Sequence, residues 1–333
     1  MSVTLKPIPL PLQTLYAELV QQVHGVIERP ASVYRRDIKG VEYVYAKRPV
    51  GSTRRDLFIG KAGDPQAAER IGLIEEENRA AKVRSRLAST LRHAGIPSPP
   101  TALSQVLDTL EEAGLLRQAV VVGTAAYQCY SAPVGHALPA SAMMTQDADL
   151  ATASLAMSAV DAGETLETIL KRADPSFRPL PGLDRAAPPS HFRSAAGFVV
   201  DLLTPQHRRT DPNPMPLPAL AAGAAPLQHL SWLIAAPMDA AVLYRSGIAV
   251  RIPQPARFAV HKLVIAQKRG GDTAKRAKDL VQAEALIHAL KAADPFALSD
   301  ACEDACAQGI TGWKRPIERS LQELGLTLED LCA

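Results

Sequence analysis

Hydrophobic residues in the first hundred positions follow a helical period, then a strand period, then a helical period again. Apolar side chains between Leu12 and Ile27 recur every three or four residues and predict an amphipathic helix. Three short runs, 33–38, 41–47 and 55–59, are separated by glycine-containing turns and predict a small antiparallel sheet. The charged stretch 65–94 predicts one long helix. These residues are expected to form a module of their own.

Proline content separates that module from the rest of the chain. The segment 95–100, Gly-Ile-Pro-Ser-Pro-Pro, is typical of a linker. We therefore expect an N-terminal module in residues 1–100, a core in residues 101–210 and a mostly helical region in residues 211–333. Because the core alternates β-branched runs with short helices, the expected fold class is α/β, or α+β, with a mixed sheet.

Bulk composition narrows the compartment and the partners. Hydrophobic residues make up 47% and charged residues 21% of the 333 positions, which is ordinary for a globular protein. The net charge of +3 is too small to require a nucleic-acid partner. The sequence has no signal-peptide-like start and no apolar stretch of about 20 residues, so no membrane partner is expected. Four scattered cysteines favour a reducing, cytoplasmic compartment.

Three aspartates on strand-like sequence are the candidate chemistry. Asp147 and Asp149 are two positions apart, and residues i and i+2 of a strand point to the same face. Asp201 follows the hydrophobic run 198–200, where a buried carboxylate would be costly without a cationic partner. Carboxylate oxygens are ligands that Mg²⁺ prefers and Mn²⁺ accepts. If the two strands are neighbours, the three carboxylates can hold divalent metal for phosphoryl transfer.

A glycine-threonine pair follows the β-branched run 118–122. Gly123 has no side chain and therefore permits close approach of the backbone to a phosphate. The helix expected over 125–130 would offer free N–H groups to an anion, and Thr124 adds a hydroxyl donor. The order of strand, Gly-Thr, helix, paired acids and a later acid meets several requirements of one chemistry, and it predicts a nucleotide-binding site.

These motifs resemble the nucleotidyltransferase superfamily that includes DNA polymerase β. Its hallmark is a hydrophobic strand, a glycine-containing turn, Asp-x-Asp and a distal Asp. More closely, the chain resembles a bacterial family named for this fold, which has a Gly-Thr turn, a Thr-x-Asp-x-Asp-Leu motif and an Arg-Phe-x-x-His-Lys-Leu helix. The resemblance covers roughly residues 118–290. Its matching segments are Val122–Thr124, Thr145–Leu150, Val200–Leu202 and Arg257–Leu263.

The resemblance implies a role for each acid. Asp147 and Asp149 would hold both metal ions, which would be Mg²⁺ or Mn²⁺. Asp201 would hold the catalytic metal and help to activate the hydroxyl of the acceptor. The fold implied is a catalytic nucleotidyltransferase core followed by a helical C-terminal region.

The resemblance also implies nucleotide-binding roles for Gly123, Thr124 and Lys262. The first two would touch the triphosphate of the NTP substrate, and Lys262 would neutralise phosphate charge. By itself, Lys262 could equally be a solvated lysine on an amphipathic helix. The chain departs from the superfamily in one respect: the gap between Gly-Thr and the first Asp is long, and a loop around 133–141 must bulge away and return.

The chain is also similar to abortive-infection nucleotidyltransferases of bacterial toxin–antitoxin systems. Those proteins share a lysine-bearing helix and a following Lys/Arg-x-x-Asp element, to which Lys262 and the pair Lys278-Asp279 could correspond. That likeness implies RNA, with a tRNA end as one version, as the acceptor. By themselves, Lys278 and Asp279 are more typical of an ordinary surface pair, because adjacent helix positions do not face each other.

Two functions of different classes fit the sequence. The first is an enzyme that transfers NMP from an NTP such as ATP to a hydroxyl of RNA, a protein or a small molecule. The second is a non-catalytic module that binds a nucleotide or nucleic acid through the N-terminal sheet, where basic residues alternate with tyrosines. The clustered acids disfavour the second, since a pure binder of anions has no use for them. The long helix 65–94 could also mediate a homodimer, and an enzyme active only with a partner remains open.

Overall fold

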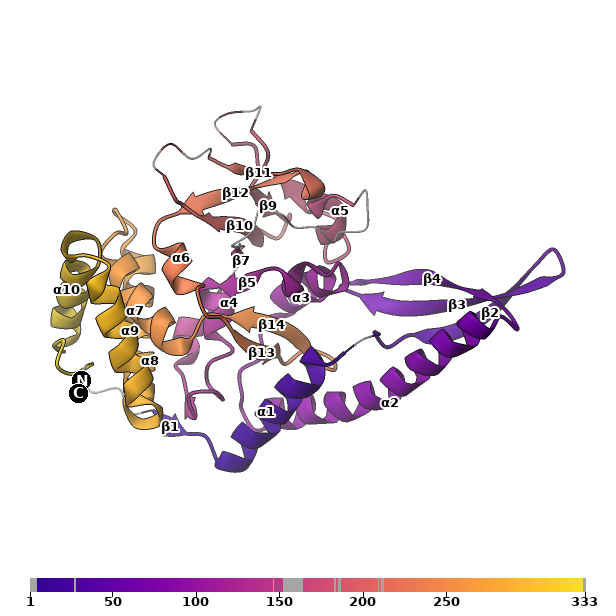
Figure 1. Cartoon of the computed structure of the whole chain (residues 1–333), viewed down its shortest axis with the longest axis horizontal. Helices are drawn as coiled ribbons and strands as arrows, with labels where there is room; N and C mark the ends of the chain where they lie inside the picture. The colour runs from indigo at the N-terminus through magenta and orange to yellow at the C-terminus, as the bar shows by residue number, and fades with distance from the viewer. Residues whose placement is uncertain are drawn as a thin grey trace.

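The computed structural model describes residues 5–26, 28–145, 147–151, 164–182, 184, 187–208, 210 and 213–331. Figure 1 shows a rounded body from which a long arm projects on one side. The arm consists of N-terminal elements, and helices from the C-terminal third of the chain lie at the opposite end of the body.

The arm is a three-stranded antiparallel sheet with a long helix along one face (Figure 1). Its elements, with the helix that precedes them, are α1 (Leu10–His24), β2 (Ser32–Ile38), β3 (Val41–Val50), β4 (Thr53–Lys61) and α2 (Pro65–His93). The strand order is β2-β3-β4, and side chains alternate along β3, so that Val44 and Ala46 are buried. The helix α2 begins at a proline, and the side chain of Asp64 accepts a hydrogen bond from the Gln66 N–H, which caps its first turn.

A mixed sheet forms the centre of the body. Its strands are β5 (Val120–Val122), β7 (Asp147–Ala151), β8 (Arg178–Pro179), β9 (His191–Arg193), β10 (Val199–Pro205), β11 (Met215–Leu217) and β12 (Ala222–Leu227). The main path runs β11-β12-β10-β7-β5, and β8 pairs with β9, which pairs with β10. The strands β7, β10 and β12 are parallel, whereas β5 runs antiparallel to β7. Alternate residues of the two central strands, among them Ala148, Leu150 and Val200, are buried in the core.

Helices pack around this sheet. Those from the C-terminal third of the chain close the body at the end away from the arm (Figure 1). The helices around the sheet are α3 (Thr101–Glu112), α4 (Gly123–Tyr127), α5 (Leu166–Leu170), α6 (Leu230–Leu233), α7 (Pro255–Ala266), α8 (Thr273–Ala293), α9 (Pro295–Ala307) and α10 (Arg315–Leu324). The helix α7 packs against α8, α9 and α10, because apolar residues such as Phe258 and Leu263 are buried on several sides of it. The hairpin of β13 (Met238–Val242) and β14 (Ile248–Ile252) packs against α1 and α3, and a short pair joins β1 (Lys6–Pro7) to β6 (His136–Ala137).

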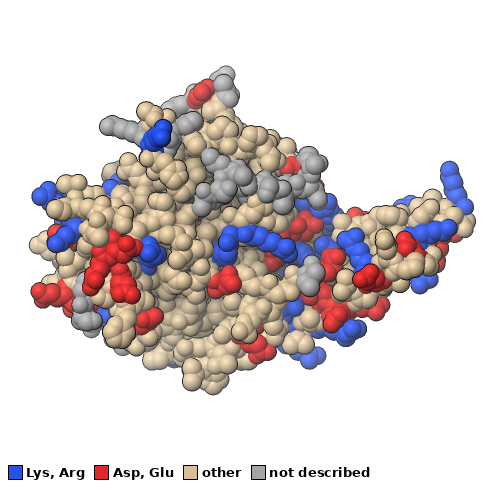
Figure 2. Space-filling model, in the orientation of Figure 1, with Lys and Arg blue, Asp and Glu red and all other residues tan. Residues whose placement is uncertain are grey.

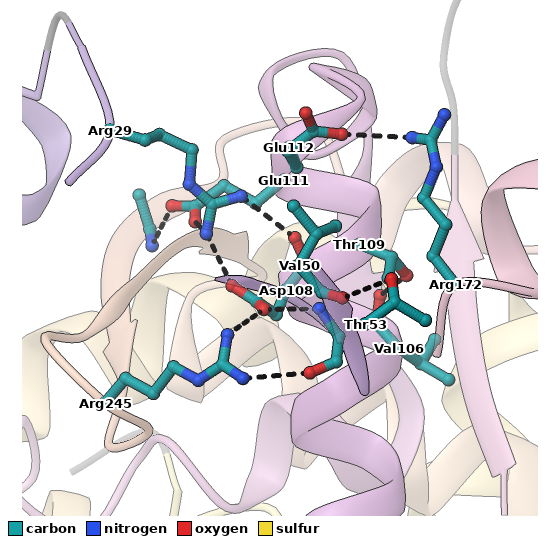
Figure 3. Close-up of polar contacts among 12 residues, drawn as sticks. Arg29, Val50, Thr53, Val106, Asp108, Thr109, Glu111, Glu112, Arg172 and Arg245 are labelled. Carbon is teal, nitrogen blue, oxygen red and sulfur yellow. Dashed lines mark hydrogen bonds and ion pairs between the residues drawn. The ribbon is translucent and has the colours of Figure 1, made fainter. Parts of the chain in front are cut away.

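A buried carboxylate ties the base of the arm to the body (Figure 3). Asp108 on α3 is 2% exposed, and it forms ion pairs with the guanidinium groups of Arg29 and Arg245. The N–H of Gly51, in the turn between β3 and β4, donates to Asp108 Oδ2 at 2.8 Å. Arg245 in turn donates to the carbonyl oxygen of Gly51 at 2.9 Å. One carboxylate therefore connects α3, the loop after α1, the arm and the β13–β14 hairpin.

The expected α/β class is confirmed, and so are most of the expected elements. The structure has the first helix, the three-stranded sheet, the long helix, the hairpin and the C-terminal helices. The helix expected over 125–130 begins earlier, at Gly123, and ends at Tyr127. The sequence did not indicate β8, β9, β11 or β12, whose segments are rich in proline or alanine. Among the described residues, no helix is long and apolar enough to cross a membrane.

Candidate active site

The parallel pairing of β7 and β10 brings the three aspartates together. Asp149 lies directly beside Asp201 in the register, and Asp147 lies beside Val199. Because Asp147 and Asp149 are two positions apart on one strand, their side chains leave the same face of the sheet. Three carboxylates therefore share one region of the sheet, although one of them is more than 50 positions away in the sequence.

The charges in this region do not balance around Asp149. Desolvation is the largest effect on its carboxyl group, and the neighbouring charges of Asp147 and Asp201 act in the same direction. Together they raise the pKa of Asp149 from 3.8 to about 7, although Lys262 and Arg269 oppose the shift. A carboxylate in such a place favours a bound cation, because a cation relieves both the desolvation and the repulsion.

Gly123 packs against Asp149. Its φ angle is +62°, a left-handed conformation that favours glycine. A Cβ atom at this position would lie 2.2 Å from Asp149 Oδ2, which is far closer than a van der Waals contact. The glycine is therefore needed to admit the aspartate, a role that its place before a helix did not indicate.

A family model described as nucleotidyltransferase matches residues 101–307, which is more than half of the chain. The chain belongs to this nucleotidyltransferase family. It is therefore a transferase enzyme of the class that moves nucleoside monophosphate groups. The match begins at the first residue of α3 and ends at the last residue of α9, so it includes all three aspartates. No curated protein and no solved structure matches the chain significantly.

Thr124 of this nucleotidyltransferase is buried rather than open to solvent. It is 7% exposed, and Gln282 on α8 approaches its hydroxyl oxygen at 3.5 Å. The same Gln282 amide donates to the carbonyl oxygen of Ala142 at 2.8 Å. This arrangement links the turn after β5 to α8 and to the loop that precedes β7. The contact between Thr124 and a triphosphate stays a prediction.

Lys262 lies in a buried ion-pair group that the sequence did not indicate. Its Nζ atom is 2.5 Å from Asp279 Oδ1, and Arg269 Nε donates to the other oxygen of Asp279 at 2.9 Å. Asp279 is 2% exposed, so the expectation that Lys278 and Asp279 form an ordinary surface pair is wrong for Asp279. Its partners lie on α7 and in the turn that follows it. Hydrophobic periodicity predicts the helices but does not show which side chains of two helices meet.

Lys278 is a further cation that faces the aspartates. Its Nζ atom donates to the carbonyl oxygen of Met144 at 2.5 Å, just before β7. Desolvation lowers the pKa of Lys278, while the charges of Asp147, Asp279 and Asp149 oppose that change. Lys278 therefore adds positive charge to the nucleotidyltransferase site from α8, next to the aspartates on the sheet.

Two of the aspartates already have polar neighbours. Asp201 Oδ1 is 2.6 Å from Nδ1 of His191 on β9, and Asp147 Oδ1 accepts a hydrogen bond from the Thr145 hydroxyl. His191 is half exposed and had no place among the predicted site residues, because the three-residue strand β9 lies in a proline-rich stretch. The antiparallel pairing of β9 with β10 alone brings His191 opposite Asp201.

The donor set suits a hard divalent cation in its chemistry. Three carboxylates supply oxygen ligands of the kind that Mg²⁺ binds, and desolvation, with the charges of Asp147 and Asp201, raises the pKa of Asp149. In the described part of the chain, no three His, Cys, Asp or Glu side chains are gathered into a ready-made metal cluster. Asp147 and Asp201 are instead engaged with Thr145 and His191. The residue types thus fit a divalent cation, although two of the three carboxylates have other polar partners.

Proposed function

We propose that this enzyme transfers a nucleoside monophosphate from an NTP to a hydroxyl acceptor, with divalent metal held by Asp147, Asp149 and Asp201. The observation that carries the proposal is the register of β7 and β10, which sets Asp149 beside Asp201. A bound Mg²⁺ or Mn²⁺ would neutralise charge that develops on the transferred phosphoryl group. The raised pKa of Asp149 supports the proposal, since a cation there removes an existing repulsion.

The chain's own residues divide the remaining work between two sides of the site. On the sheet side, Asp201 is suited to take the proton of the acceptor hydroxyl, and His191 holds its Oδ1 atom through the 2.6 Å contact. On the helix side, Lys262 and Lys278 supply positive charge for the triphosphate. Lys262 is buried and forms an ion pair with Asp279, whereas Lys278 donates to the backbone carbonyl of Met144. The charge of Lys278 is therefore more available to a phosphate than that of Lys262.

The non-catalytic alternative receives less support from the surface of the arm. Figure 2 shows Lys and Arg mixed with Asp and Glu over the arm, with no extended patch of one sign on this face. Two of the basic side chains there have acidic neighbours, since Arg35 lies 3.1 Å from Glu42 and Lys47 lies 3.8 Å from Asp56. Among the acceptor classes, a hydroxyl of RNA, a protein or a small molecule each fits the chemistry, and a toxin-like role would make tRNA the acceptor.

Calorimetric titration with each of the four NTPs, with and without Mg²⁺, tests the proposal. We expect binding that requires Mg²⁺ in the wild type and is lost in Asp149→Asn, because the amide cannot supply a charged ligand. Asp300→Asn on α9 is the matched control, since Asp300 is exposed and far from the sheet in sequence and in fold. Equal binding of NTP by Asp149→Asn and wild type would refute the metal assignment.

A further inference from the structure

A large cleft lies where the arm meets the body. Its volume is about 1340 Å³, which exceeds the ~300–1,000 Å³ of ordinary small-molecule pockets. Its walls come from the end of α1 and the loop after it, one side of α2, the end of α3 and the β13–β14 turn. None of the three active-site aspartates lines it, so the cleft is separate from the catalytic centre.

Positive charge is concentrated in this cleft, which we call the joint cleft. Seven Lys and Arg side chains and four carboxylates line it, an excess of three positive charges. The whole chain has a net charge of only +3, so the remaining residues are neutral on balance. Six of the seven cations are arginines, whose planar guanidinium groups bind phosphate oxygens through two parallel hydrogen bonds. The wall is therefore suited to an anionic ligand.

Three of the four carboxylates of the joint cleft already have cationic partners, Glu75 has none among the described contacts, and several cations are unpaired. Asp108 is held by Arg29 and Arg245, as Figure 3 shows, and Glu77 pairs with Arg84. In contrast, Lys82 and Arg86 lie one turn apart on α2 and are exposed. These two side chains have no acidic partner among the described contacts, and they leave positive charge for a ligand.

Two buried guanidinium groups in the wall have unused donors. The Nε atoms of Arg84 and Arg251 are buried and have no hydrogen-bond partner among the described residues. Arg84 is only 4% exposed, and Arg251 uses one of its Nη atoms to donate to the carbonyl oxygen of Arg117 at 2.7 Å. A buried donor without a partner is unfavourable. Both side chains line the cleft, so their guanidinium groups add to its positive charge even though these Nε atoms are not exposed.

The rest of the wall mixes small polar residues with apolar ones and one aromatic ring. Val23, Leu116 and Ile248 contribute hydrocarbon surface, and Tyr244 adds a ring against which the Arg245 guanidinium packs at 5.0 Å. Cationic grooves with aromatic side chains are how proteins hold single-stranded nucleic acid, since the cations follow the backbone and rings stack on bases. A small anion would use the arginines but would leave this surface and most of the volume empty.

We propose that the joint cleft binds the phosphodiester backbone of a single-stranded nucleic acid. This site needs neither metal nor NTP, so it stands apart from the chemistry of the three aspartates. Its consequence for the reaction rests on the proposed function. If a strand is held here, the acceptor hydroxyl belongs to a nucleic acid rather than to a protein or a small molecule.

Fluorescence anisotropy with a labelled oligouridylate of about 16 nucleotides tests the proposal. The titration is done in EDTA without NTP, so that a failure of the metal assignment does not affect it. The test variant is the triple substitution Lys82→Ala, Arg86→Ala and Arg117→Ala, which removes three exposed cations from the cleft. The control is Arg79→Ala, Lys314→Ala and Arg319→Ala, which removes the same charge from exposed positions outside the cleft.

We expect the test variant to bind about tenfold or more weakly, while the control stays within about twofold of the wild type. The slope of log K against log salt should fall by about 2, because each lost phosphate contact on a single strand contributes about 0.7. The test variant should keep its Mg²⁺-dependent NTP binding and its thermal transition. If the triple variant does not fold, the double variant Lys82→Ala and Arg86→Ala, confined to exposed positions of α2, replaces it.

Four outcomes would overturn the proposal. The first is that the wild type does not bind RNA. The second is that the test and control variants are weakened equally, which would indicate only diffuse attraction to the surface. A third is displacement of RNA by inorganic triphosphate at equal phosphate concentration, which would indicate a pocket for a small anion. The fourth is equally effective displacement by polyglutamate, which would indicate an acidic protein partner.

Discussion

Asp108 is buried and Asp149 is partly buried, and their surroundings have opposite charge. Around Asp108 the structure places Arg29, Arg245 and the backbone N–H of Gly51. Around Asp149 it places two more aspartates, whose effect on its pKa outweighs the opposing charges of Lys262 and Arg269. The first carboxylate is compensated by the protein itself, and the second is not.

This difference separates a structural site from a functional one. A compensated buried charge holds elements together, and its loss leaves its partners without a counter-charge. An uncompensated cluster of like charges costs stability, and such local conflicts are expected where a ligand completes the arrangement. The predictions that follow test this contrast.

The largest effect on stability is expected for Asp108→Asn. The amide has nearly the same shape but leaves Arg245 without its charged partner and Arg29 with Glu111 alone, at 3.3 Å. We expect the free energy of unfolding to fall by about 3–5 kcal/mol in urea titrations. The control Asp300→Asn should change it by about 0.5 kcal/mol at most, because Asp300 is exposed. A folded Asp108→Asn protein should keep NTP binding, and a loss below about 1 kcal/mol would show that Asp108 is not the tie between arm and body.

The next effect concerns the contact of Gly123 with Asp149, tested against a second glycine. Both Gly123 and Gly63 have positive φ angles, +62° and +88°, so alanine is strained at either position. Only at Gly123 would the new Cβ meet a side chain, whereas nothing lies within 4 Å at Gly63. We expect Gly123→Ala to lose about 2–3 kcal/mol of stability and Gly63→Ala about 1 kcal/mol. Calorimetry should also show weaker Mg²⁺-dependent NTP binding for Gly123→Ala alone, and equal behaviour of the two variants would mean that the contact is unimportant.

A smaller effect on stability is expected for Asp149→Asn without metal. This substitution should raise the free energy of unfolding, whereas Asp108→Asn should lower it. Since the pKa of Asp149 is raised from 3.8 to about 7, the folded protein keeps a proton that the unfolded chain has released. The stability that this proton provides is fully present below about pH 4 and is lost as the pH rises through about 7. The full shift would correspond to about 4 kcal/mol, but Asp149 is only partly buried and solvent screens part of the repulsion. In EDTA at pH 8, Asp149→Asn should therefore be more stable than wild type by about 1–2 kcal/mol, and at pH 4 the two should agree. A variant that is less stable than wild type at pH 8 would contradict the uncompensated character of the site.

The two central strands could be predicted from the sequence, whereas their surroundings could not. The runs that became β7 and β10 are visible as apolar stretches, and the i, i+2 spacing of Asp147 and Asp149 fixes their common face. That the strands are parallel neighbours, and that Asp149 aligns with Asp201, depends on long-range pairing that periodicity does not report. The three candidate acids could be chosen from the order of the motifs, because metal binding requires carboxylates and these residue types can be recognised in the sequence.

The site residues that were missed are those placed by tertiary structure. His191 stands on a three-residue strand in a proline-rich stretch and meets Asp201 only through pairing. Asp279 has the sequence surroundings of a surface residue, yet Lys262 and Arg269 enclose it. The same holds for Asp108, whose partners are far from it along the chain. The packing of Gly123 against Asp149 was missed as well, because the sequence cannot show which side chain lies against the glycine, and its contact with a phosphate stays a prediction.

The smallest effect is expected at the edge of the acidic cluster, where His191 contacts Asp201 at 2.6 Å. Donation from Nδ1 of His191 fixes one oxygen of Asp201 and leaves the other for a metal. Groups that orient metal ligands change affinity by about 10–100-fold when they are removed. Because His191 is half exposed, we expect only about a fivefold loss of Mn²⁺ affinity in His191→Phe, read by paramagnetic resonance. His191→Asn keeps a short hydrogen-bond donor and should lose less Mn²⁺ affinity than His191→Phe. The control Arg193→Ala, on the same strand, should keep the Mn²⁺ affinity of the wild type. A loss equal to that of Asp201→Asn would instead make His191 a ligand, and the acidic cluster would then extend across β9.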